Sequence, residues 1–151
     1  IWEYKYNFIE PLVNPLNEIL KKYYLAVFEQ QLINKKPLVT FIPLQGARFR
    51  WRGFNQAEIL AKKFASDLNL EFNETLKRKK FKKPQMEIKS YQARFENIKD
   101  SFEIININKI KNREIILIDD IATTGATLME AAKVLKQNGA KKIYGLVIAK
   151  G

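Results

Sequence analysis

Residues 115–127 have the sequence IILIDDIATTGAT, and this stretch decides the fold of the chain. Its first four residues are all aliphatic, which indicates a strand buried on both faces, as in a parallel sheet. Two aspartates stand at the end of the predicted strand, and small or hydroxylated residues then lead into a helix predicted to begin near Thr127. Strand, tight turn and helix in this order are typical of α/β folds, whose ligands bind at the carboxyl ends of the strands.

The predicted turn suits a phosphate group. The first N–H groups of a helix have no partner within the helix and carry a partial positive charge, so an anion in front of them is stabilised. Gly125 and Ala126 are small enough for the backbone to approach such an anion closely. Hydroxyl donors come from the three threonines of the turn, Thr123, Thr124 and Thr127.

Asp119 and Asp120 beside this turn indicate a second part of the ligand. Their charge excludes them as partners of the phosphate, but carboxylates accept hydrogen bonds from the hydroxyl groups of a sugar. The stretch therefore predicts a site for a phosphorylated sugar. It lacks the lysine of a Walker loop and the three glycines of a dinucleotide-binding motif. The simpler alternative is an ordinary strand, turn and helix in which the aspartates only cap the helix.

Composition and charge narrow the class of protein. The 151 residues suit one domain, and with 0 Cys and 0 His the sequence excludes disulfides, Cys or His nucleophiles and typical zinc sites within itself. It contains no apolar run of membrane-spanning length and no signal-peptide pattern, so we expect a soluble, cytoplasmic protein without membrane insertion. The net charge of +11 predicts acidic partners, and a polyanionic small ligand or a nucleic acid would both fit.

The first part of the chain predicts one helix and one strand. Apolar residues recur at helical spacing from Leu16 to Phe28, after Asn14 as N-cap and Pro15 as the first helical residue. This helix either covers an edge of the sheet or forms a dimer surface, so the oligomeric state stays open. Residues 38–43 form a short buried strand in this interpretation, ended by a proline.

Further helices and strands alternate along the rest of the chain. Asn55, with Glu58 as capping-box partner, predicts the start of a second helix. Periodicity is then absent until the decisive stretch, apart from a short predicted strand at residues 102–107, which indicates a mobile or extended excursion. After the turn, a third helix is predicted to end at residues 138–139, and a buried strand to follow at 143–149.

The alternation predicts an α/β fold: a mostly parallel twisted sheet flanked by helices, with an N-terminal helical segment. We expect a single domain over residues 1–151, in which residues 1–36 form a helical cover and residues 37–151 the core. The ligand of such a fold is expected at the carboxyl ends of the parallel strands.

A second candidate site follows the first predicted core strand, where residues 48–56 have the sequence RFRWRGFNQ. Arg48, Arg50 and Arg52 alternate, so in an extended chain their guanidinium groups point to one side. Such planar donors suit phosphate oxygens, and a pyrophosphate is a natural target. The alternative is a solvated basic loop whose aromatic residues are ordinary core or surface residues.

These motifs together resemble a known family. The stretch at residues 115–127 resembles the phosphoribosyl pyrophosphate (PRPP) loop of class I phosphoribosyltransferases. The sequence RGFNQ at residues 52–56, followed by AEILA and later by DDIATTGAT, is similar to the ComF group of these proteins, which is associated with natural competence. The resemblance covers residues 39–149 and implies the class I phosphoribosyltransferase fold.

The resemblance also implies roles for individual residues. Asp119 and Asp120 would bind the ribose hydroxyl groups of PRPP. The 5′-phosphate would lie on the turn, whose residues are Ala122, Thr123, Thr124, Gly125, Ala126 and Thr127. The pyrophosphate would face the loop after the first core strand, where the candidates are Leu44, Gln45, Arg48, Arg50 and Arg52. Mg²⁺ would bridge pyrophosphate oxygens and ribose hydroxyl groups, with no protein ligand and no catalytic residue assigned.

Three features differ from the usual pattern of this family. Its members usually carry a cysteine zinc ribbon before the transferase part, whereas this sequence has 0 Cys and begins at Ile1 rather than Met. Either such a region lies upstream of Ile1, which the start without Met favours, or the chain belongs to a finger-less branch of the family. Zinc is expected only if an upstream cysteine region exists. Residues 45–47 are Gln-Gly-Ala where the family tends to have His, Pro or a basic residue, and Lys82 stands at a position often occupied by Thr.

A strongly basic run lies between the two candidate sites and contains Lys77, Arg78, Lys79, Lys80, Lys82 and Lys83. In phosphoribosyltransferases a loop at this point often closes over the reacting centre, which would bring a cation to the departing pyrophosphate. Alternatively, the run binds single-stranded DNA through its phosphates, with Phe81 or Tyr91 stacking on bases. A solvated run of charges without a specific role is the third reading.

Three functional hypotheses follow. The first is Mg²⁺-dependent transfer of a phosphoribosyl group from PRPP to an unidentified acceptor, in a protein of natural competence and DNA transformation. The second is a non-catalytic transformation factor that binds PRPP and single-stranded DNA and contacts DNA-uptake proteins. The third is a nucleotide-binding regulator of purine or pyrimidine metabolism.

Overall fold

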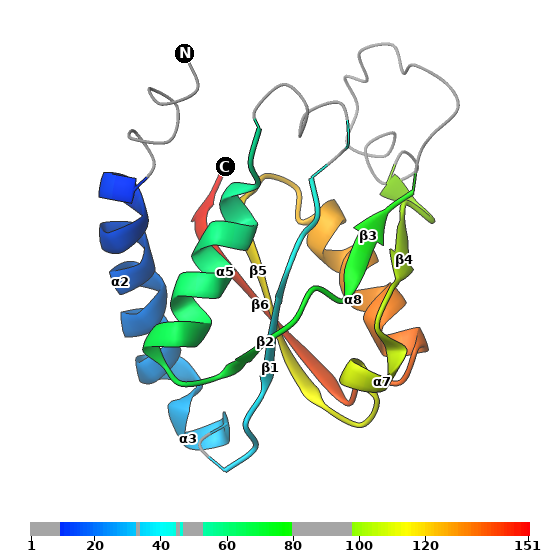
Figure 1. The fold of residues 1–151 in the computed structure, drawn as a ribbon, viewed down its shortest axis with the longest axis horizontal. Helices are drawn as coiled ribbons and strands as arrows, with labels where there is room; N and C mark the ends of the chain where they lie inside the picture. Colours follow the sequence, from blue (N-terminus) through cyan, green and yellow to red (C-terminus); the bar gives the residue numbers. More distant parts are fainter. Residues whose placement is uncertain (1–9, 33, 45, 47–52, 80–97) are drawn as a thin grey trace.

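The computed structural model describes residues 10–32, 34–44, 46, 53–79 and 98–151 (Figure 1). Their helices and strands, in chain order, are α2 (Glu10–Val27), α3 (Glu29–Leu32), β1 (Leu38–Phe41), α5 (Gln56–Asp67), β2 (Glu71–Phe72), β3 (Leu76–Arg78), β4 (Phe102–Ile104), α7 (Ile107–Ile110), β5 (Glu114–Ala122), α8 (Ala126–Gln137) and β6 (Lys142–Lys150). Among these described segments, no helix combines the length and apolar character needed to cross a membrane.

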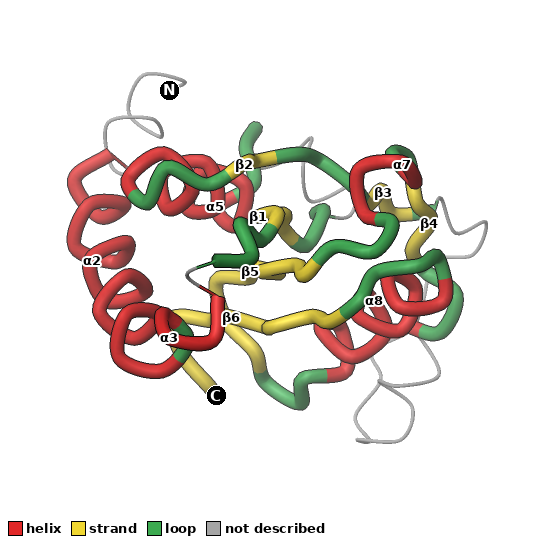
Figure 2. Tube along the Cα trace, turned by 90° about the horizontal axis from the view of Figure 1, so that it is seen from below, coloured by secondary structure: helices red, strands yellow, loops and turns green. Residues whose placement is uncertain are grey.

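Four parallel strands form the central sheet, in the order β2, β1, β5, β6. Val39 of β1 lies opposite Ile116 of β5, and Ile118 of β5 lies opposite Leu146 of β6. The chain leaves β1 toward one edge of the sheet through α5, and leaves β5 toward the other edge through α8. Because parallel crossovers are right-handed, these two helices cover opposite faces, as Figures 1 and 2 show.

The residues of β5 alternate between two hydrophobic cores, as the two-residue period of a strand requires. Ile116 and Ile118 pack in the core beneath α2 and α5. Ile115 and Leu117 pack in the core beneath α8, together with β3, β4 and α7. The four aliphatic residues are fully buried because both faces of β5 are covered. This layered, mostly parallel α/β arrangement confirms the predicted fold class.

The first helix is longer than predicted. α2 begins at Glu10 rather than after Asn14, and Pro15 lies inside it. A proline in the second turn removes only one backbone hydrogen bond, while burial of the inner face through Leu20 and Tyr24 stabilises the whole helix. Tertiary packing therefore overrides the helix-start signal in the sequence.

The decisive strand is also longer than predicted. β5 continues through both aspartates, because β6 pairs with it as far as Ala122. The carboxylates thus lie within the last part of the strand and not after it. The last strand, β6, is only partly buried: Tyr144 and Leu146 are buried, whereas Gly145 is exposed. Within the described sheet β6 is an edge strand, so the strand predicted at residues 143–149 is present but only partly buried.

The segment predicted as an extended excursion contains a small antiparallel sheet in its described part. β3 pairs with β4, with Lys77 opposite Glu103. The strand predicted at residues 102–107 ends at Ile104, and α7 follows. Leu76 and Phe102 insert into the core beneath α8, so this sheet is attached to the body of the protein by buried apolar side chains.

Asn55 ties the end of β1 to the start of α5. Its side-chain oxygen accepts a hydrogen bond from the backbone N–H of Ala57 at 3.1 Å, and its amide donates to the carbonyl oxygen of Ile42 at 3.0 Å. The predicted N-cap is therefore confirmed. Glu58, the predicted capping-box partner, forms an ion pair with Lys62 at 2.6 Å.

We expect Asn55→Ala to lower the free energy of unfolding by about 2 kcal/mol, because it removes the cap and leaves a buried carbonyl without its donor. Asn55→Ser keeps a capping oxygen and should lose about half as much. Urea unfolding measures both changes, with the exposed Asn108→Ala as a control that should behave like the parent protein. Equal stability of Asn55→Ala and the parent would contradict the role given to this side chain.

Candidate functional site

The predicted phosphate turn lies between the end of β5 and the first residue of α8 (Figure 1). Gly125 precedes the helix with φ of +75°, a left-handed conformation in which other residues are strained. A Cβ added at this position would meet no atom within 4 Å, so the space beside the turn is open. Thr124 Oγ1 accepts a hydrogen bond from the backbone N–H of Ala126 at 3.3 Å.

The residues predicted to hold a phosphate all lie in or beside this turn: Ala122, Thr123, Thr124, Gly125, Ala126 and Thr127. Ala126 is buried, Thr123 is exposed, and the other four are half-buried. The α8 N-terminus and the hydroxyl groups of the turn therefore lie at the same end of the sheet. Binding of phosphate there stays a prediction.

Strand geometry separates the two carboxylates. Successive residues of a strand point to opposite faces, so Asp119 shares the face of Leu117, beneath α8, and Asp120 that of Ile118, beneath α2 and α5. Asp119 Oδ1 accepts a hydrogen bond from the backbone N–H of Asp120 at 2.9 Å, and Asp120 Oδ1 accepts one from that of Ile121 at 2.8 Å. Asp119 and Asp120, called the acidic pair below, thus face two different environments.

Burial, and after it the negative charge of Asp120, raises the pKa of Asp119 from 3.8 to about 7. The positive charge of Arg78 acts in the opposite direction. Near neutral pH, Asp119 is therefore close to the midpoint of its titration. A ligand that brings hydroxyl donors or a cation would favour the charged form, so binding and ionisation are coupled at this site.

An apolar cavity of about 290 Å³ adjoins the acidic pair. It lies between α2, α5 and the carboxyl ends of β5 and β6. Its polar lining comes from Gln56 and Asp120, and its apolar lining consists of Leu12, Val13, Leu16, Leu60, Ile121, Ile148 and Ala149. Sequence reasoning missed this cavity, because its walls come from four elements that are distant in the chain. The one feature of the sequence that pointed to an apolar cavity here is Ile121, an aliphatic residue directly after the two aspartates.

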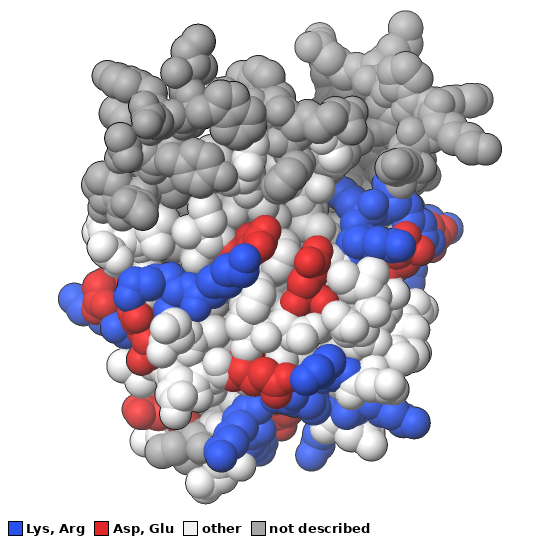
Figure 3. Space-filling model, viewed as in Figure 1, with Lys and Arg blue, Asp and Glu red and all other residues white. Residues whose placement is uncertain are grey.

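The structure describes only the start of the basic run. Lys77 and Lys79 are exposed, and Lys77 forms an ion pair with Glu103 at 3.2 Å. Arg78 is half-buried, with its guanidinium carbon 5.2 Å from the ring centroid of Phe102. Figure 3 shows Lys and Arg side chains gathered over β3 and β4. The rest of the run lies outside the described residues: Lys80, Lys82 and Lys83.

The predicted pyrophosphate loop is also only partly described. Leu44 is half-buried, shortly after the end of β1 at the carboxyl edge of the sheet. The other candidates lie outside the described residues: Gln45, Arg48, Arg50 and Arg52. The role of this loop therefore stays a prediction.

The described residues contain no group of three or more His, Cys, Asp or Glu side chains that could hold a metal ion. Asp119 and Asp120 point to opposite faces of β5, so no protein ligand is assigned to a Mg²⁺ ion here. A Mg²⁺ ion at this site would be held by oxygens of a bound substrate and by water.

Comparison with known sequences shows to which proteins the chain is similar. The model of the phosphoribosyl transferase domain matches residues 52–150. Competence protein F of Haemophilus influenzae is 34% identical over an alignment of 133 residues, and the match covers 83% of this chain and 58% of that protein. DNA utilization protein YhgH of Escherichia coli K12 is 27% identical over 105 residues, which are 70% of this chain and 45% of that protein. The chain thus spans about half the length of these relatives.

Comparison with solved structures agrees on the fold. Hypoxanthine phosphoribosyl transferase of Trypanosoma cruzi superposes with a TM-score of 0.56. The alignment covers 95% of this chain and 75% of that protein, with 13% sequence identity. At this identity the likeness concerns the fold alone.

Proposed function

The chain belongs to the phosphoribosyl transferase family and to its ComF group, and from this membership we propose that it binds PRPP and transfers the phosphoribosyl group to an acceptor. One observation carries the proposal. The acidic pair at the end of β5 and the N-terminus of α8 lie on the two sides of a single open turn. Acceptors for sugar hydroxyl groups and donors for a phosphate are therefore adjacent, as a ribose 5-phosphate group requires.

In the proposed complex, the 5′-phosphate lies on the turn before α8, where backbone N–H groups and threonine hydroxyls donate to it. Asp119 and Asp120 accept hydrogen bonds from the ribose hydroxyl groups. The pyrophosphate faces the loop that begins at Leu44 and contains three arginines. A Mg²⁺ ion bound together with PRPP would neutralise part of the pyrophosphate charge.

The chemistry proposed for this site is positioning and charge stabilisation. As the bond between ribose C1 and the pyrophosphate oxygen lengthens, positive charge develops on the ribose ring and negative charge on the leaving group. Asp119 and Asp120 lie on the ribose side in this proposal and stabilise the positive charge on the ribose ring. The arginines of the loop after Leu44 stabilise the negative charge on the pyrophosphate. The acceptor then forms the new bond to C1, and no covalent intermediate with the protein is needed.

The apolar cavity beside Asp120 supports a place for the acceptor. Its volume of about 290 Å³ suits a small ring system rather than a polymer. Gln56 and Asp120 supply the polar groups that could orient an otherwise apolar acceptor. This placement would put the acceptor next to the ribose-binding residues.

Calorimetric titration with PRPP and Mg²⁺ tests the binding step. Each single variant, Asp119→Asn and Asp120→Asn, should weaken PRPP binding about 10-fold, and the double variant about 100-fold or more, because hydrogen bonds to charged groups are lost. Asp100→Asn makes the same chemical change at an exposed position outside the site and should bind like the parent. A double variant that binds PRPP as tightly as the parent would overturn the proposal.

A second candidate function is binding of single-stranded DNA. It is favoured by the Lys and Arg side chains over β3 and β4 (Figure 3) and by the name of the E. coli relative, a DNA utilization protein. In this case the chain would act in natural competence or DNA transformation. Binding of a labelled oligonucleotide should weaken at least about tenfold between about 50 mM and 200 mM salt if phosphate contacts dominate. Salt-independent or undetectable binding would exclude this role.

A further inference from the structure

Basic side chains gather at the amino ends of the parallel strands, at the lower end of the molecule in Figure 3. They come from three loops, which precede β1, β5 and β6. Six of them are called the amino-end cluster below: Lys35, Lys36, Lys111, Arg113, Lys141 and Lys142. The nine residues of β5 separate this end from the phosphate turn by about 25 Å, at the rise of a strand. The amino-end cluster is therefore not part of the proposed PRPP site.

Hydrogen bonds join the three loops into one surface. The Arg113 guanidinium donates through Nη2 to the carbonyl oxygen of Lys36 at 3.2 Å, which links the loops before β5 and β1. The backbone N–H of Lys141 donates to the carbonyl oxygen of Arg113 at 2.8 Å, which links the loops before β6 and β5. The N–H of Asn112 donates to the carbonyl oxygen of Gly139, also at 2.8 Å. The backbone that carries the cluster is thus held in place by contacts between loops.

Two carboxylates at this end are already paired with other cations. Glu71 accepts from Arg113 at 2.6 Å and from Lys109 at 3.0 Å. Glu114 is only 5% exposed and forms an ion pair with Lys35 at 3.0 Å. These contacts use three of the cations of this end and leave the others to face solvent.

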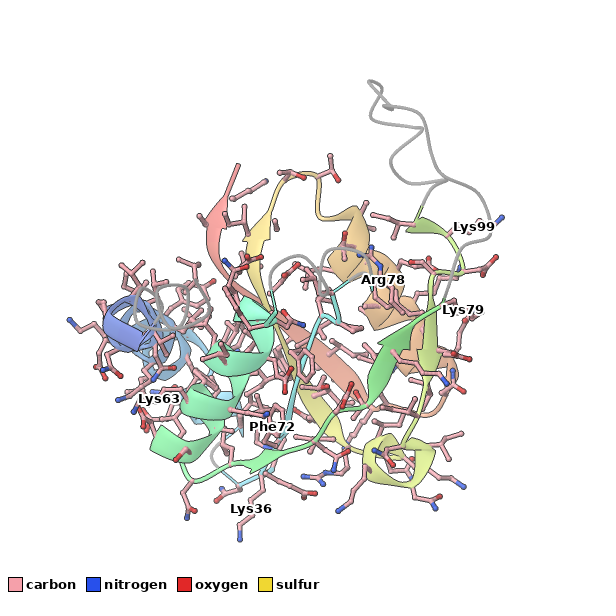
Figure 4. The ribbon with its side chains drawn as sticks, turned by 45° about the horizontal axis from the view of Figure 1, so that its top comes forward. Lys36, Lys63, Phe72, Arg78, Lys79 and Lys99 are labelled. Carbon is pink, nitrogen blue, oxygen red and sulfur yellow. The ribbon has the colours of Figure 1, made fainter. Side chains whose placement is uncertain are left out.

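Four exposed lysines remain in the amino-end cluster: Lys36, Lys111, Lys141 and Lys142. In the described part of the chain, none of the four forms an ion pair with a carboxylate. Figure 4 shows the Lys36 side chain pointing away from the ribbon, at the end opposite Lys79 and Lys99. The cluster therefore presents positive charge that the described residues do not neutralise.

The four lysines follow the order of the strands. β1, β5 and β6 are neighbours in the sheet, and adjacent strands lie about 4.8 Å apart. Lys36 lies before the first of them, Lys111 before the second, and Lys141 and Lys142 at the start of the third. The charges thus form a row across the sheet. A row of separate cations suits the repeated charges of a polyanion backbone.

The residue types favour a nucleic acid over an acidic protein as this polyanion. Lysine is depleted in protein–protein interfaces, whereas lysine contacts to phosphates are the main source of affinity in non-specific nucleic-acid binding. The ring beside Lys142 is that of Tyr144, which is only 7% exposed and has the Lys142 ammonium 4.7 Å from its centroid. Because this ring is covered, it offers no surface on which a base could stack, and contacts would go to the phosphates.

We propose that the amino-end cluster binds the phosphate backbone of a single-stranded nucleic acid, independently of base sequence. The proposal takes its ligand class from the second candidate function, but it places the strand at the amino ends of β1, β5 and β6 and not over β3 and β4. It does not depend on PRPP binding. The chain would then hold a nucleic acid and a small ligand at opposite ends of one sheet.

Fluorescence anisotropy of a labelled single-stranded oligonucleotide tests the proposal. The amino-end variant combines Lys36→Gln, Lys111→Gln and Lys141→Gln, so each of the three loops loses one charge. It should bind the oligonucleotide at least about 30-fold more weakly at low salt. The slope of log affinity against log salt should become shallower by about 2, because each phosphate contact of a single strand contributes about 0.7.

A matched variant controls for net charge. Lys22→Gln, Lys62→Gln and Lys133→Gln together remove the same charge from exposed positions on α2, α5 and α8. This variant should lose no more than about threefold in affinity and keep the slope of the parent, because its lysines lie outside the row. Equal losses in the two triple variants would overturn the proposal, since binding would then follow net charge alone.

A third variant separates the two basic surfaces. Lys77→Gln with Lys79→Gln removes charge from β3 and its end. If this variant loses binding while the amino-end variant does not, the strand lies over β3 and β4, and the proposal is wrong while the second candidate function stands. A parent protein that binds no oligonucleotide would contradict both. PRPP binding, measured separately, should be the same in the amino-end variant and the parent.

Competition distinguishes a nucleic acid from an acidic protein. Unlabelled oligonucleotide should displace the labelled one at a lower concentration than poly-glutamate of equal total charge. More effective displacement by poly-glutamate would assign the amino-end cluster to an acidic protein partner and overturn the proposal.

Discussion

Replacing Asp119 by asparagine is expected to make the protein more stable at about pH 8, on the order of 2–4 kcal/mol, although the same change removes an acceptor from the ligand site. The reason is the raised pKa of this carboxyl group, which burial and Asp120 bring from 3.8 to about 7. At alkaline pH the parent protein must keep this buried group charged. Asparagine has a similar shape and can still accept the backbone hydrogen bond from Asp120, but carries no charge.

The gain in stability of Asp119→Asn over the parent protein should increase as the pH rises. Between about pH 4 and pH 7 the unfolded chain loses the Asp119 proton before the folded protein does, so the stability of the parent falls as pH rises. The asparagine variant lacks this decline. The difference in stability should therefore be small below about pH 4, grow through this window, and be complete above about pH 7.

Urea unfolding of parent and Asp119→Asn at the two ends of this window measures the effect. Asp100→Asn, at an exposed aspartate, should show no such pH-dependent gain. A variant that is less stable than the parent at about pH 8 would contradict the electrostatic description of the site. A more stable variant that has lost PRPP binding would instead show that the acidic pair is kept at the expense of stability.

Phe102→Ala is expected to lower the free energy of unfolding by about 3–5 kcal/mol. Phe102 is 2% exposed and packs with Leu76 in the core beneath α8. Its truncation removes a large apolar contact and leaves a cavity that the short strands β3 and β4 cannot close without moving. It also removes the ring on which the Arg78 guanidinium packs.

Two comparisons test whether Phe102 attaches the small sheet of β3 and β4 to the body of the protein. Ile105→Ala changes a residue next to β4 that is 38% exposed, and should lower the free energy of unfolding by about 1 kcal/mol or less. Amide hydrogen exchange in Phe102→Ala should show loss of protection in β3 and β4 beyond that in β1 and β5. A loss of stability no larger than that of Ile105→Ala would mean that the small sheet is not attached through Phe102.

The central strand and turn could be predicted well from the sequence, because their signals are local. Four aliphatic residues in a row have one common explanation, a strand covered on both faces, and β5 has that environment. A glycine before a helix with small and hydroxylated neighbours predicts an open turn, and Gly125 has the corresponding backbone conformation. Such signals depend on backbone geometry within a few residues.

Element boundaries were predicted less well, because packing decides them. Pro15 is compatible with a helix start, yet burial of Leu20 and Tyr24 stabilises a helix that begins earlier. The end of β5 is set by its pairing with β6 and not by its own residues. The antiparallel pair β3–β4 was missed because its two short strands are far apart in the chain and have no shared periodicity.

The sequence by itself determined which groups lie together at the candidate site: two carboxylates, a turn of small and hydroxylated residues, and the α8 N-terminus. These groups lie together because they are consecutive in the chain. Only the tertiary structure decided that Asp119 lies on the face of β5 beneath α8 and that Asp120 lines an apolar cavity. The physical reason is that a strand sends adjacent side chains to opposite faces, and what covers each face depends on how distant helices and strands pack.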